Sequence, residues 1–153
     1  MDDGRVEAIF LAGERGAPRT AVREVRAVAG MGLEGDRYFG MRRTGGRKRQ
    51  YERQVTLIEA EAVDAVSAAG AAFAPGDARR NLVTRGVSLN DLVGRTFRVG
   101  GARLRGVERC DPCVRLTRLT YQGVERDLRD RGGLRAEILE GGDIRVGDPV
   151  AAE

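Results

Sequence analysis

The residues best suited to chemistry are two cysteines three positions apart, Cys110 and Cys113. Between them, Asp111 is a strong helix N-cap and Pro112 is favoured at a first helical position. A helix is therefore predicted to start here, with Cys113 at its second position and Cys110 outside it. Unpaired backbone N–H groups and the helix dipole favour a thiolate at such a position. We expect the pKa of the Cys113 thiol to lie below its ordinary value of about 8.5, which makes Cys113 the better nucleophile or metal ligand.

The same C-x-x-C spacing leaves other interpretations open. Free cysteines are often small buried hydrophobic residues. The pair could form a redox dithiol, but that motif normally sits in a thioredoxin-like βαβ unit, which this strand pattern does not predict. A structural zinc is disfavoured because the chain has no histidine, so two further ligands would have to be carboxylates or come from another chain.

The absence of histidine excludes more chemistry than this. No Ser–His or Cys–His pair can form, and no side chain titrates near neutrality without being perturbed. The single lysine, Lys48, lies in a Gly/Arg-rich stretch, so a pyridoxal phosphate Schiff base is disfavoured. Catalysis would use a thiolate, a shifted carboxylate, a tyrosine or a bound cofactor.

The positive charge is concentrated in one segment. Residues 42–53 hold six basic side chains and one acidic one, a net charge of +5, and the rest of the chain is nearly neutral. This segment is either a solvated loop or attracts an anionic ligand. Nucleic acid is disfavoured as a partner because only Tyr51 is interleaved and the basic run does not continue on a periodic helix.

Length and composition indicate one globular domain over residues 1–153. Of the 153 residues, 41% are hydrophobic and 33% are charged, values typical of soluble proteins. No apolar run approaches the roughly 20 residues of a membrane-spanning helix, and the start has no signal-peptide pattern. We therefore expect a cytoplasmic protein with free thiols and no membrane partner.

Strands dominate the elements that must position these residues. Residues 6–11 and 21–28 read as two strands separated by a Gly/Pro turn, and residues 54–58 as a third. Small and apolar residues then recur at helical spacing from Ala62 to Ala69, with Gly70 where a helix ends. The helix is therefore predicted to follow the third strand directly.

Two Gly-Gly pairs predict hairpins. Residues 96–99 and 102–107 flank Gly100-Gly101, a connection typical of type I′ turns, in which both central residues take positive φ. Residues 134–138 and 144–146 flank Gly141-Gly142 in the same way. Strand following strand without regular helical crossovers favours a mainly antiparallel barrel, or a strongly bent sheet, with helices in the connections.

Several motifs in order resemble those of MOSC domains, named after the C-terminal domain of molybdenum cofactor sulfurase. They cover most of the chain: Gly32-Leu33-Glu34-Gly35-Asp36-Arg37-Tyr38, Gln54-Val55-Thr56-Leu57-Ile58-Glu59, Arg79-Arg80-Asn81-Leu82-Val83-Thr84-Arg85-Gly86, Cys110-Asp111-Pro112-Cys113, Gly132-Gly133-Leu134-Arg135-Ala136-Glu137, Gly141-Gly142 and Gly147-Asp148. The resemblance implies a mainly β (α+β) fold: an antiparallel β-barrel of the MOSC type with a few connecting helices. It also implies a role with molybdenum cofactor or its sulfur.

The resemblance places the family's metal-binding or sulfur-carrying cysteine on Cys113. A soft thiolate suits a molybdenum centre and could equally hold a persulfide sulfur. The anionic pterin cofactor is expected to contact residues of the matching motifs, which are Asp36, Arg37, Arg80, Asn81 and Cys110. From their residue types alone, the arginines could be surface charges, Asn81 a turn or cap, and Asp36 a group that orients Arg37 or closes a turn.

The function implied is molybdenum cofactor binding or sulfur carrying, with possible reduction of N-hydroxylated compounds as in the related amidoxime-reducing enzymes. Such an enzyme would be a sulfur transferase or an oxidoreductase. The chain has no room for a pyridoxal phosphate domain and no ferredoxin-like cysteine set, so it would need a separate sulfur or electron donor protein. Tyr38 stands where some members carry histidine. The alternatives are a non-catalytic module that binds an anionic ligand or partner protein, and a C-x-x-C dithiol redox protein.

Overall fold

The computed structural model describes residues 4–40 and 54–153, and the basic segment 42–53 lies outside them. The strands are β1 (Gly4–Leu11), β2 (Thr20–Val22), β3 (Glu24–Val28), β4 (Gly32–Leu33), β5 (Val55–Glu59), β6 (Leu82–Arg85), β7 (Thr96–Val99), β8 (Ala102–Arg109), β9 (Leu134–Glu140), β10 (Gly142–Arg145) and β11 (Pro149–Ala152). The helices are α1 (Ala60–Ala68), α2 (Val114–Leu119) and α3 (Val124–Asp127), with short 3-10 turns η2 (Pro75–Ala78) and η3 (Leu89–Leu92).

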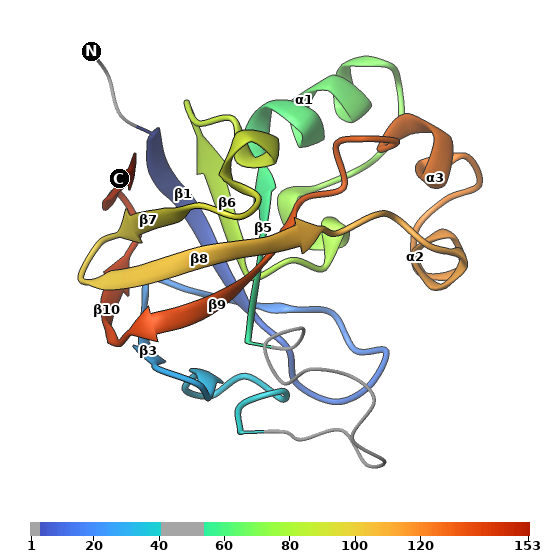
Figure 1. Cartoon of the computed structure of the whole chain (residues 1–153). Coiled ribbons are helices and arrows are strands. Elements are labelled where there is room, and N and C mark those ends of the chain that lie inside the picture. The colour runs from blue at the N-terminus through green and yellow to red at the C-terminus, as the bar shows by residue number, and fades with distance from the viewer. Residues whose placement is uncertain (1–3, 41–53) are drawn as a thin grey trace.

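Seven strands close into a mixed β-barrel (Figure 1). Their order is β11, β7, β8, β9, β5, β6 and β1, and pairing of β11 with β1 completes the ring. All of these neighbours are antiparallel except β5 and β6, which run parallel and are joined through α1 and η2. The short strand β2 extends the sheet beside β1, and β10, β3 and β4 form a separate three-stranded sheet. The expected mainly β barrel with connecting helices is confirmed.

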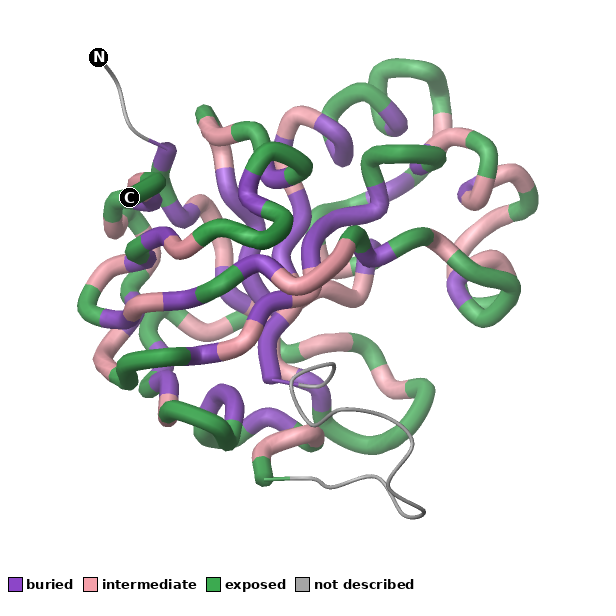
Figure 2. Tube along the Cα trace, viewed as in Figure 1, coloured by how far each residue is buried: buried purple, intermediate pink, exposed green. Residues whose placement is uncertain are grey.

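The barrel interior is filled by alternate residues of its strands (Figure 2). Val55 and Leu57 of β5 face inward, as do Phe97 of β7 and Leu104 of β8. Period-two alternation is what a sheet with one buried face requires. In β7 and β8 it leaves the intervening arginines outside the barrel.

A second hydrophobic core lies between the barrel wall and the helices. Ile58 of β5 and Val83 of β6 point away from the barrel interior and join the buried residues of α1, α2 and α3. Tyr121 closes this region by donating a hydrogen bond to Asp127 at 2.8 Å. Burial and this carboxylate raise the pKa of Tyr121 to about 12. Ile58 is thus a buried apolar residue on the outer face of β5, where the helices cover the barrel.

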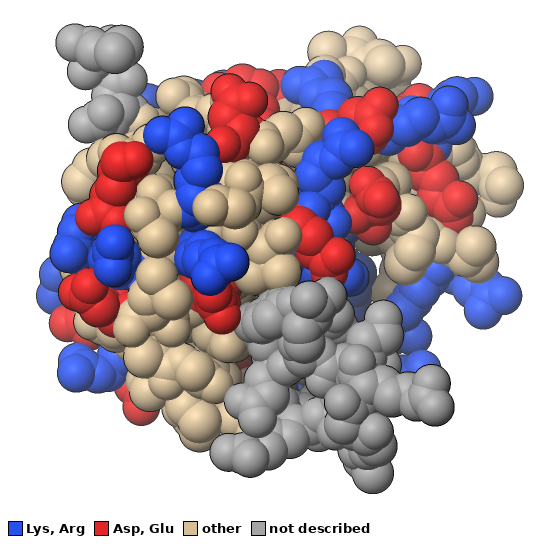
Figure 3. Space-filling view, viewed as in Figure 1, with Lys and Arg blue, Asp and Glu red and all other residues tan. Residues whose placement is uncertain are grey.

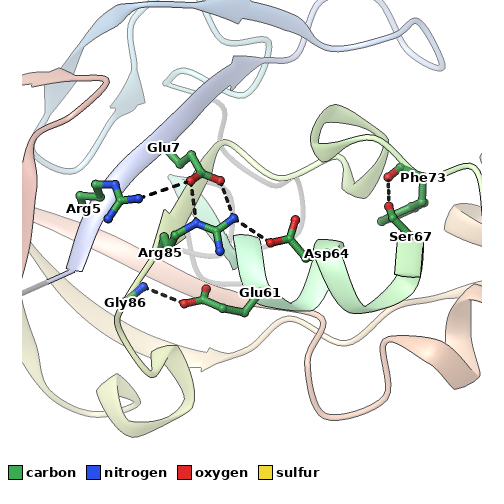
Figure 4. Close-up of polar contacts among 8 residues, drawn as sticks. All are labelled: Arg5, Glu7, Glu61, Asp64, Ser67, Phe73, Arg85 and Gly86. Carbon is green, nitrogen blue, oxygen red and sulfur yellow. Dashed lines mark hydrogen bonds and ion pairs between the residues drawn. The ribbon is translucent and has the colours of Figure 1, made fainter. Parts of the chain in front are cut away.

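Polar contacts fix α1 against the barrel (Figure 4). Arg85 at the end of β6 donates to both carboxylate oxygens of Glu7, at 2.7 and 3.0 Å, and to Asp64 of α1 at 2.8 Å. Glu61, one helical turn earlier, accepts a hydrogen bond from the backbone N–H of Gly86 at 2.8 Å. The α1 helix is therefore held at the same end of β6 from two of its turns.

The structure confirms the first two predicted strand regions, the strand at residues 54–58, the helix that ends before Gly70, and the hairpin at Gly100-Gly101. Two details are wrong. The segment 21–28 divides at Arg23, because β2 pairs with β1 whereas β3 pairs with β10. The Gly-Gly turn has positive φ only at Gly100 (54°), the pattern of a type II′ turn and not of type I′.

The second predicted hairpin is also wrong. Strand β9 pairs with β8 and β5, and β10 leaves the barrel to pair with β3. The backbones at Gly142 and Gly101 lie so close that a Cβ on Gly142 would collide with the Gly101 carbonyl oxygen. Because Gly142 has no Cβ, the barrel hairpin and the three-stranded sheet can approach each other closely at this point.

Candidate functional site

A pocket of about 150 Å³ lies at one end of the barrel, where β8 ends and β5, β6 and β9 begin. Its described lining combines four guanidinium groups with one thiol: Arg19, Tyr38, Thr56, Arg79, Arg80, Asn81, Cys110 and Arg135. Guanidinium groups form bidentate hydrogen bonds with phosphate, sulfate and carboxylate groups. The composition of the wall therefore favours an anion.

Strand register brings two of these residues together. Thr56 of β5 is paired directly with Arg135 of β9. Their neighbours Val55 and Leu57 point into the barrel, so Thr56 and Arg135 point outward. Two residues further along β5, Ile58 is covered by the second core. The second core covers the outer face of the sheet at Ile58, whereas Thr56, two residues earlier, lines the pocket.

Asn81 ties the strands together beneath the pocket. Its Oδ1 accepts hydrogen bonds from the backbone N–H and the hydroxyl of Thr56, at 3.1 and 3.3 Å. Its Nδ2 donates to the Phe10 carbonyl at 3.1 Å and to the Asp36 carboxylate at 3.2 Å. Asn81 is only 6% exposed. Both amide hydrogens are therefore used inside the protein, and Asn81 acts to position its neighbours.

Arg80 holds the thiol-bearing end of β8. It donates from Nε to the Gly132 carbonyl at 2.9 Å, from Nη2 to the Cys110 carbonyl at 3.1 Å, and from Nη1 to the Ala78 carbonyl at 3.3 Å. The Cys110 N–H in turn donates to the Gly133 carbonyl at 2.8 Å. A guanidinium has five N–H donors, so two of those on Arg80 make no hydrogen bond to the residues that the structure describes.

Arg19 and Arg79 bring positive charge to the same wall from two different loops. Arg19 donates from Nη2 to the Arg79 carbonyl at 3.2 Å, and its Nε is buried without a hydrogen-bond partner in the described part of the chain. Burial and the Arg79 charge hold the pKa of Arg19 below its ordinary value. Burial and Arg115 do the same for Arg79, whose backbone is left-handed at φ 60°. Two strained or desolvated cations facing one pocket favour an anion between them.

Arg135 and Cys110 are both part of the pocket wall. Burial lowers the pKa of Arg135, but the neighbouring Cys110 and Glu108 outweigh this effect, so that the pKa of Arg135 is raised. Cys110 is 3% exposed. It is therefore a buried cysteine that borders an arginine-lined cavity.

A second pocket, of about 190 Å³, adjoins the first because both include Arg19 and Arg79 in their walls. Its remaining described lining comes from the loop before β2, from η2 and from the end of α2: Gly16, Pro18, Gly76, Asp77, Leu119 and Thr120. The arginine pair Arg19 and Arg79 therefore borders both pockets.

The predicted helix start at Asp111-Pro112, with Cys113 at the second helical position, is wrong. Helix α2 begins at Val114, and Cys113 is its N-cap residue, with extended backbone and no side-chain capping hydrogen bond. Asp111 and Pro112 lie before the helix, where Pro112 is close to Gly132. Cys113 is exposed and is not among the residues of the pocket wall, whereas Cys110 is.

Asp36 and Arg37 lie beside the pocket without being part of its described wall. Asp36, 6% exposed, accepts hydrogen bonds from the Ala12 N–H at 2.7 Å, from Asn81 and from the Tyr38 N–H. It therefore closes a turn and fastens it to the end of β1. Arg37 is exposed, with its guanidinium over the Tyr38 ring at 5.7 Å.

Sequence reasoning identified Arg80, Asn81 and Cys110 but missed four of the residues around them. Thr56, Arg79 and Arg135 lie inside the motifs quoted above. The motifs therefore contained these residues, but sequence reasoning did not choose them as site residues. Arg19 lies outside those motifs, and nothing distinguishes it from the other arginines until β1 and β2 pair. Over residues 4–40 and 54–153, no group of three or more His, Cys, Asp or Glu side chains could hold a metal, and no helix is long and apolar enough to span a membrane.

Comparison with known proteins agrees with this fold. The chain resembles YuaD from Bacillus subtilis (TM-score 0.79, 17% identity, covering 96% of this chain and 93% of that one). It also resembles YiiM from Geobacillus stearothermophilus (0.74, 15%, 98% and 75%) and YiiM from Escherichia coli (0.67, 19%, 97% and 69%). No curated protein sequence matches it. The family model for the MOSC domain matches residues 30–151, and the chain therefore belongs to the MOSC domain family.

Proposed function

We propose that this chain binds molybdenum cofactor or handles its terminal sulfur, and that the arginine-lined pocket receives the anionic end of the cofactor. The observation that carries the proposal is the meeting of four guanidinium groups and a thiol in one pocket of a MOSC domain. Arg80 and Arg135 come from motifs that the sequence shares with the family. The same pocket makes an uncharged ligand a poor fit, since desolvated arginines require an anion.

The donor set fits part of the cofactor. Among the described residues, Arg19 has a buried Nε without a partner, and two N–H groups of Arg80 make no hydrogen bond. A phosphate accepts hydrogen bonds of this kind. Pockets for drug-sized ligands measure about 300–1,000 Å³. A pocket of about 150 Å³ therefore suits the phosphate end, and the pterin would extend beyond it.

Two thiols are available near this end of the barrel. Cys110 is in the pocket wall, and Cys113 is exposed three residues further on. Three extended residues span at most about 11 Å, so both lie within reach of one ligand. When bound, the cofactor supplies a molybdenum centre held by dithiolene sulfurs, for which a thiolate is a suitable soft ligand. We assign Cys113 to the metal or to the carried sulfur, and Asp36 and Asn81 to holding the wall.

Anaerobic reconstitution with molybdenum cofactor, followed by gel filtration and metal analysis, tests the proposal. Wild-type protein should retain molybdenum, and Cys113→Ala and Arg80→Ala should retain less. A charge-assisted hydrogen bond contributes about 1.5–3 kcal/mol, so Arg80→Ala should weaken retention by about 10- to 100-fold. Arg129→Ala, an exposed arginine outside both pockets, is the matched control.

Equal molybdenum retention by the wild type and Cys113→Ala contradicts the role of Cys113. Equal retention by Arg80→Ala contradicts the placement of the anionic end. If wild-type protein retains no molybdenum, the chain is better described as a module for another anionic ligand. If cofactor is retained, reduction of an N-hydroxylated compound with a supplied electron donor tests for an oxidoreductase.

A further inference from the structure

The arginine pocket is too small for a pterin and too highly charged for a neutral compound. Four guanidinium groups line a volume of about 150 Å³, and tetrahedral oxyanions are small enough to occupy such a space. The four arginines come from three segments of the chain: Arg19 from the loop before β2, Arg79 and Arg80 from the stretch before β6, and Arg135 from β9. The geometry favours a compact anion whose oxygens point in several directions.

The wall of this pocket also contains a sulfur nucleophile in a fixed position. The backbone of Cys110 is held on both sides, by the Arg80 Nη2 donation to its carbonyl and by its own N–H donation to Gly133. A Cβ on Gly132 would collide with the Cys110 carbonyl oxygen, so the two backbone segments are in direct contact. Cys110 and Arg135 are both part of the pocket wall. Cys110 is therefore a buried residue with a fixed backbone that borders the anion-binding volume.

We propose that the pocket binds a small sulfur-bearing oxyanion of the thiosulfate class and that Cys110 takes its outer sulfur. The inference rests on the sulfur-handling part of the proposed function, for which it names the donor class. It makes Cys110 the residue that receives the sulfur, and of the two roles assigned above to Cys113 it leaves that of metal ligand. The guanidinium groups hold the sulfonate oxygens, which leaves the outer sulfur free to meet Cys110 Sγ.

The transfer balances without any other reactant. The Cys110 thiolate attacks the outer sulfur of thiosulfate, and a bond forms between Sγ and that sulfur. The bond from that sulfur to the sulfonate breaks, and its electron pair leaves with sulfite. The products are a Cys110 persulfide and one sulfite per chain. Arginines that bind the sulfonate also stabilise the charge that grows on departing sulfite.

Cys113 has a different position. It is exposed, makes no side-chain capping bond, and is not part of the described pocket wall. A sulfonate bound by the four arginines would therefore present its sulfur to Cys110 and not to Cys113. Because phosphate is also a tetrahedral oxyanion, it should occupy the same arginines and inhibit the transfer without supplying sulfur.

Reduced full-length protein mixed with thiosulfate tests this. We expect release of up to one equivalent of sulfite, a mass gain of one sulfur atom that fragmentation locates on Cys110, and competitive inhibition by inorganic phosphate. Cys110→Ser should abolish the release, while Cys113→Ser should retain it. Arg135→Gln should raise the thiosulfate concentration for half-saturation by about 10- to 100-fold, since it removes a charge-assisted hydrogen bond. Arg129→Gln serves as the control for loss of one surface charge.

Sulfite release that depends on Cys113 and not on Cys110 overturns the assignment, as does wild-type protein that releases no sulfite. If Cys110→Ser fails to fold, the location of the added sulfur in the wild type and the Arg135→Gln result decide the matter. Molybdenum retention without sulfite release would leave the proposed cofactor site standing and reject this inference. Sulfite release without molybdenum retention would support this inference and reject the proposed cofactor site.

Discussion

At the residue scale, the side chains of the site divide into those that hold the wall and those that face the ligand. Asn81 uses its entire amide on Thr56, Phe10 and Asp36, and Asp36 accepts three hydrogen bonds in turn. Arg19 keeps an unpartnered buried Nε among the described residues, and Arg135 shares the pocket wall with Cys110. The holding residues should therefore determine stability, and the facing residues should determine binding.

Replacing Asn81 with alanine tests the holding role. The Thr56 N–H, the Phe10 carbonyl and the Asp36 carboxylate would each lose a partner, and an unsatisfied buried group costs about 1–3 kcal/mol. We expect the free energy of unfolding, measured by urea denaturation, to fall by at least about 2 kcal/mol. Asn90→Ala, which removes an exposed amide, should change it by less than about 0.5 kcal/mol. Equal effects of the two changes would contradict the assignment.

Motif reading located Arg80, Asn81 and Cys110 near one another because each belongs to a short stretch with a distinctive pattern. It could not tell that the Asn81 amide is turned inward, since that depends on Phe10 and Asp36, which are distant in sequence. It also could not single out Arg19. Arg19 can be recognised as a site residue only once strand pairing places it in the pocket wall.

At the element scale, β9 begins at two glycines that bring it close to its neighbours. Gly133 has φ 117°, and a Cβ there would collide with the carbonyl oxygen of Leu57 in β5. The same segment receives hydrogen bonds from Arg80 and Cys110. The approach of β9 to β5 at this point sets the position of Arg135, two residues later.

Gly133→Ala should therefore be far more damaging than Gly70→Ala. Both positions have positive φ, 117° and 107°, so both substitutions strain the backbone. A Cβ added at Gly70 would enter open space, whereas one at Gly133 would meet the β5 backbone. Overpacking costs about 1–3 kcal/mol, and we expect the midpoint of thermal unfolding to fall further for Gly133→Ala by a corresponding amount. Similar midpoints for the two variants would show that β9 does not pack as described.

Local patterns predicted the elements whose partners are local. The hairpin of β7 and β8 and the ending of α1 before Gly70 follow from neighbouring residues. The pairing of β10 with β3 joins segments more than a hundred residues apart, so no local turn signal could show it. Helix α2 starts later, at Val114, and the segment before it packs closely against Gly132 at Cys110 and Pro112. Tertiary contact overrode a valid N-cap signal there.

At the scale of the whole molecule, arginines on the outside of β7 and β8 pair with acidic side chains, whereas the arginines of the site lie beside one another. On the face in Figure 3, basic and acidic side chains alternate in small groups. On β7 and β8, Arg98 and Arg103 pair with Glu140 and Glu153. The pocket instead gathers four arginines around a cavity at the barrel end. Barrel closure through β1 and β11 supplies a rigid frame that can hold these like charges together.

Calorimetric titration with inorganic phosphate at low salt tests most directly whether this end of the barrel receives an oxyanion. The account predicts one site per chain, with affinity reduced about 10- to 100-fold in Arg19→Gln and unchanged in Arg129→Gln. If Arg19→Gln binds as the wild type does, while joint neutralisation of Arg42, Arg43, Arg47 and Lys48 abolishes binding, the basic segment and not the pocket is the anion site, and the account is contradicted.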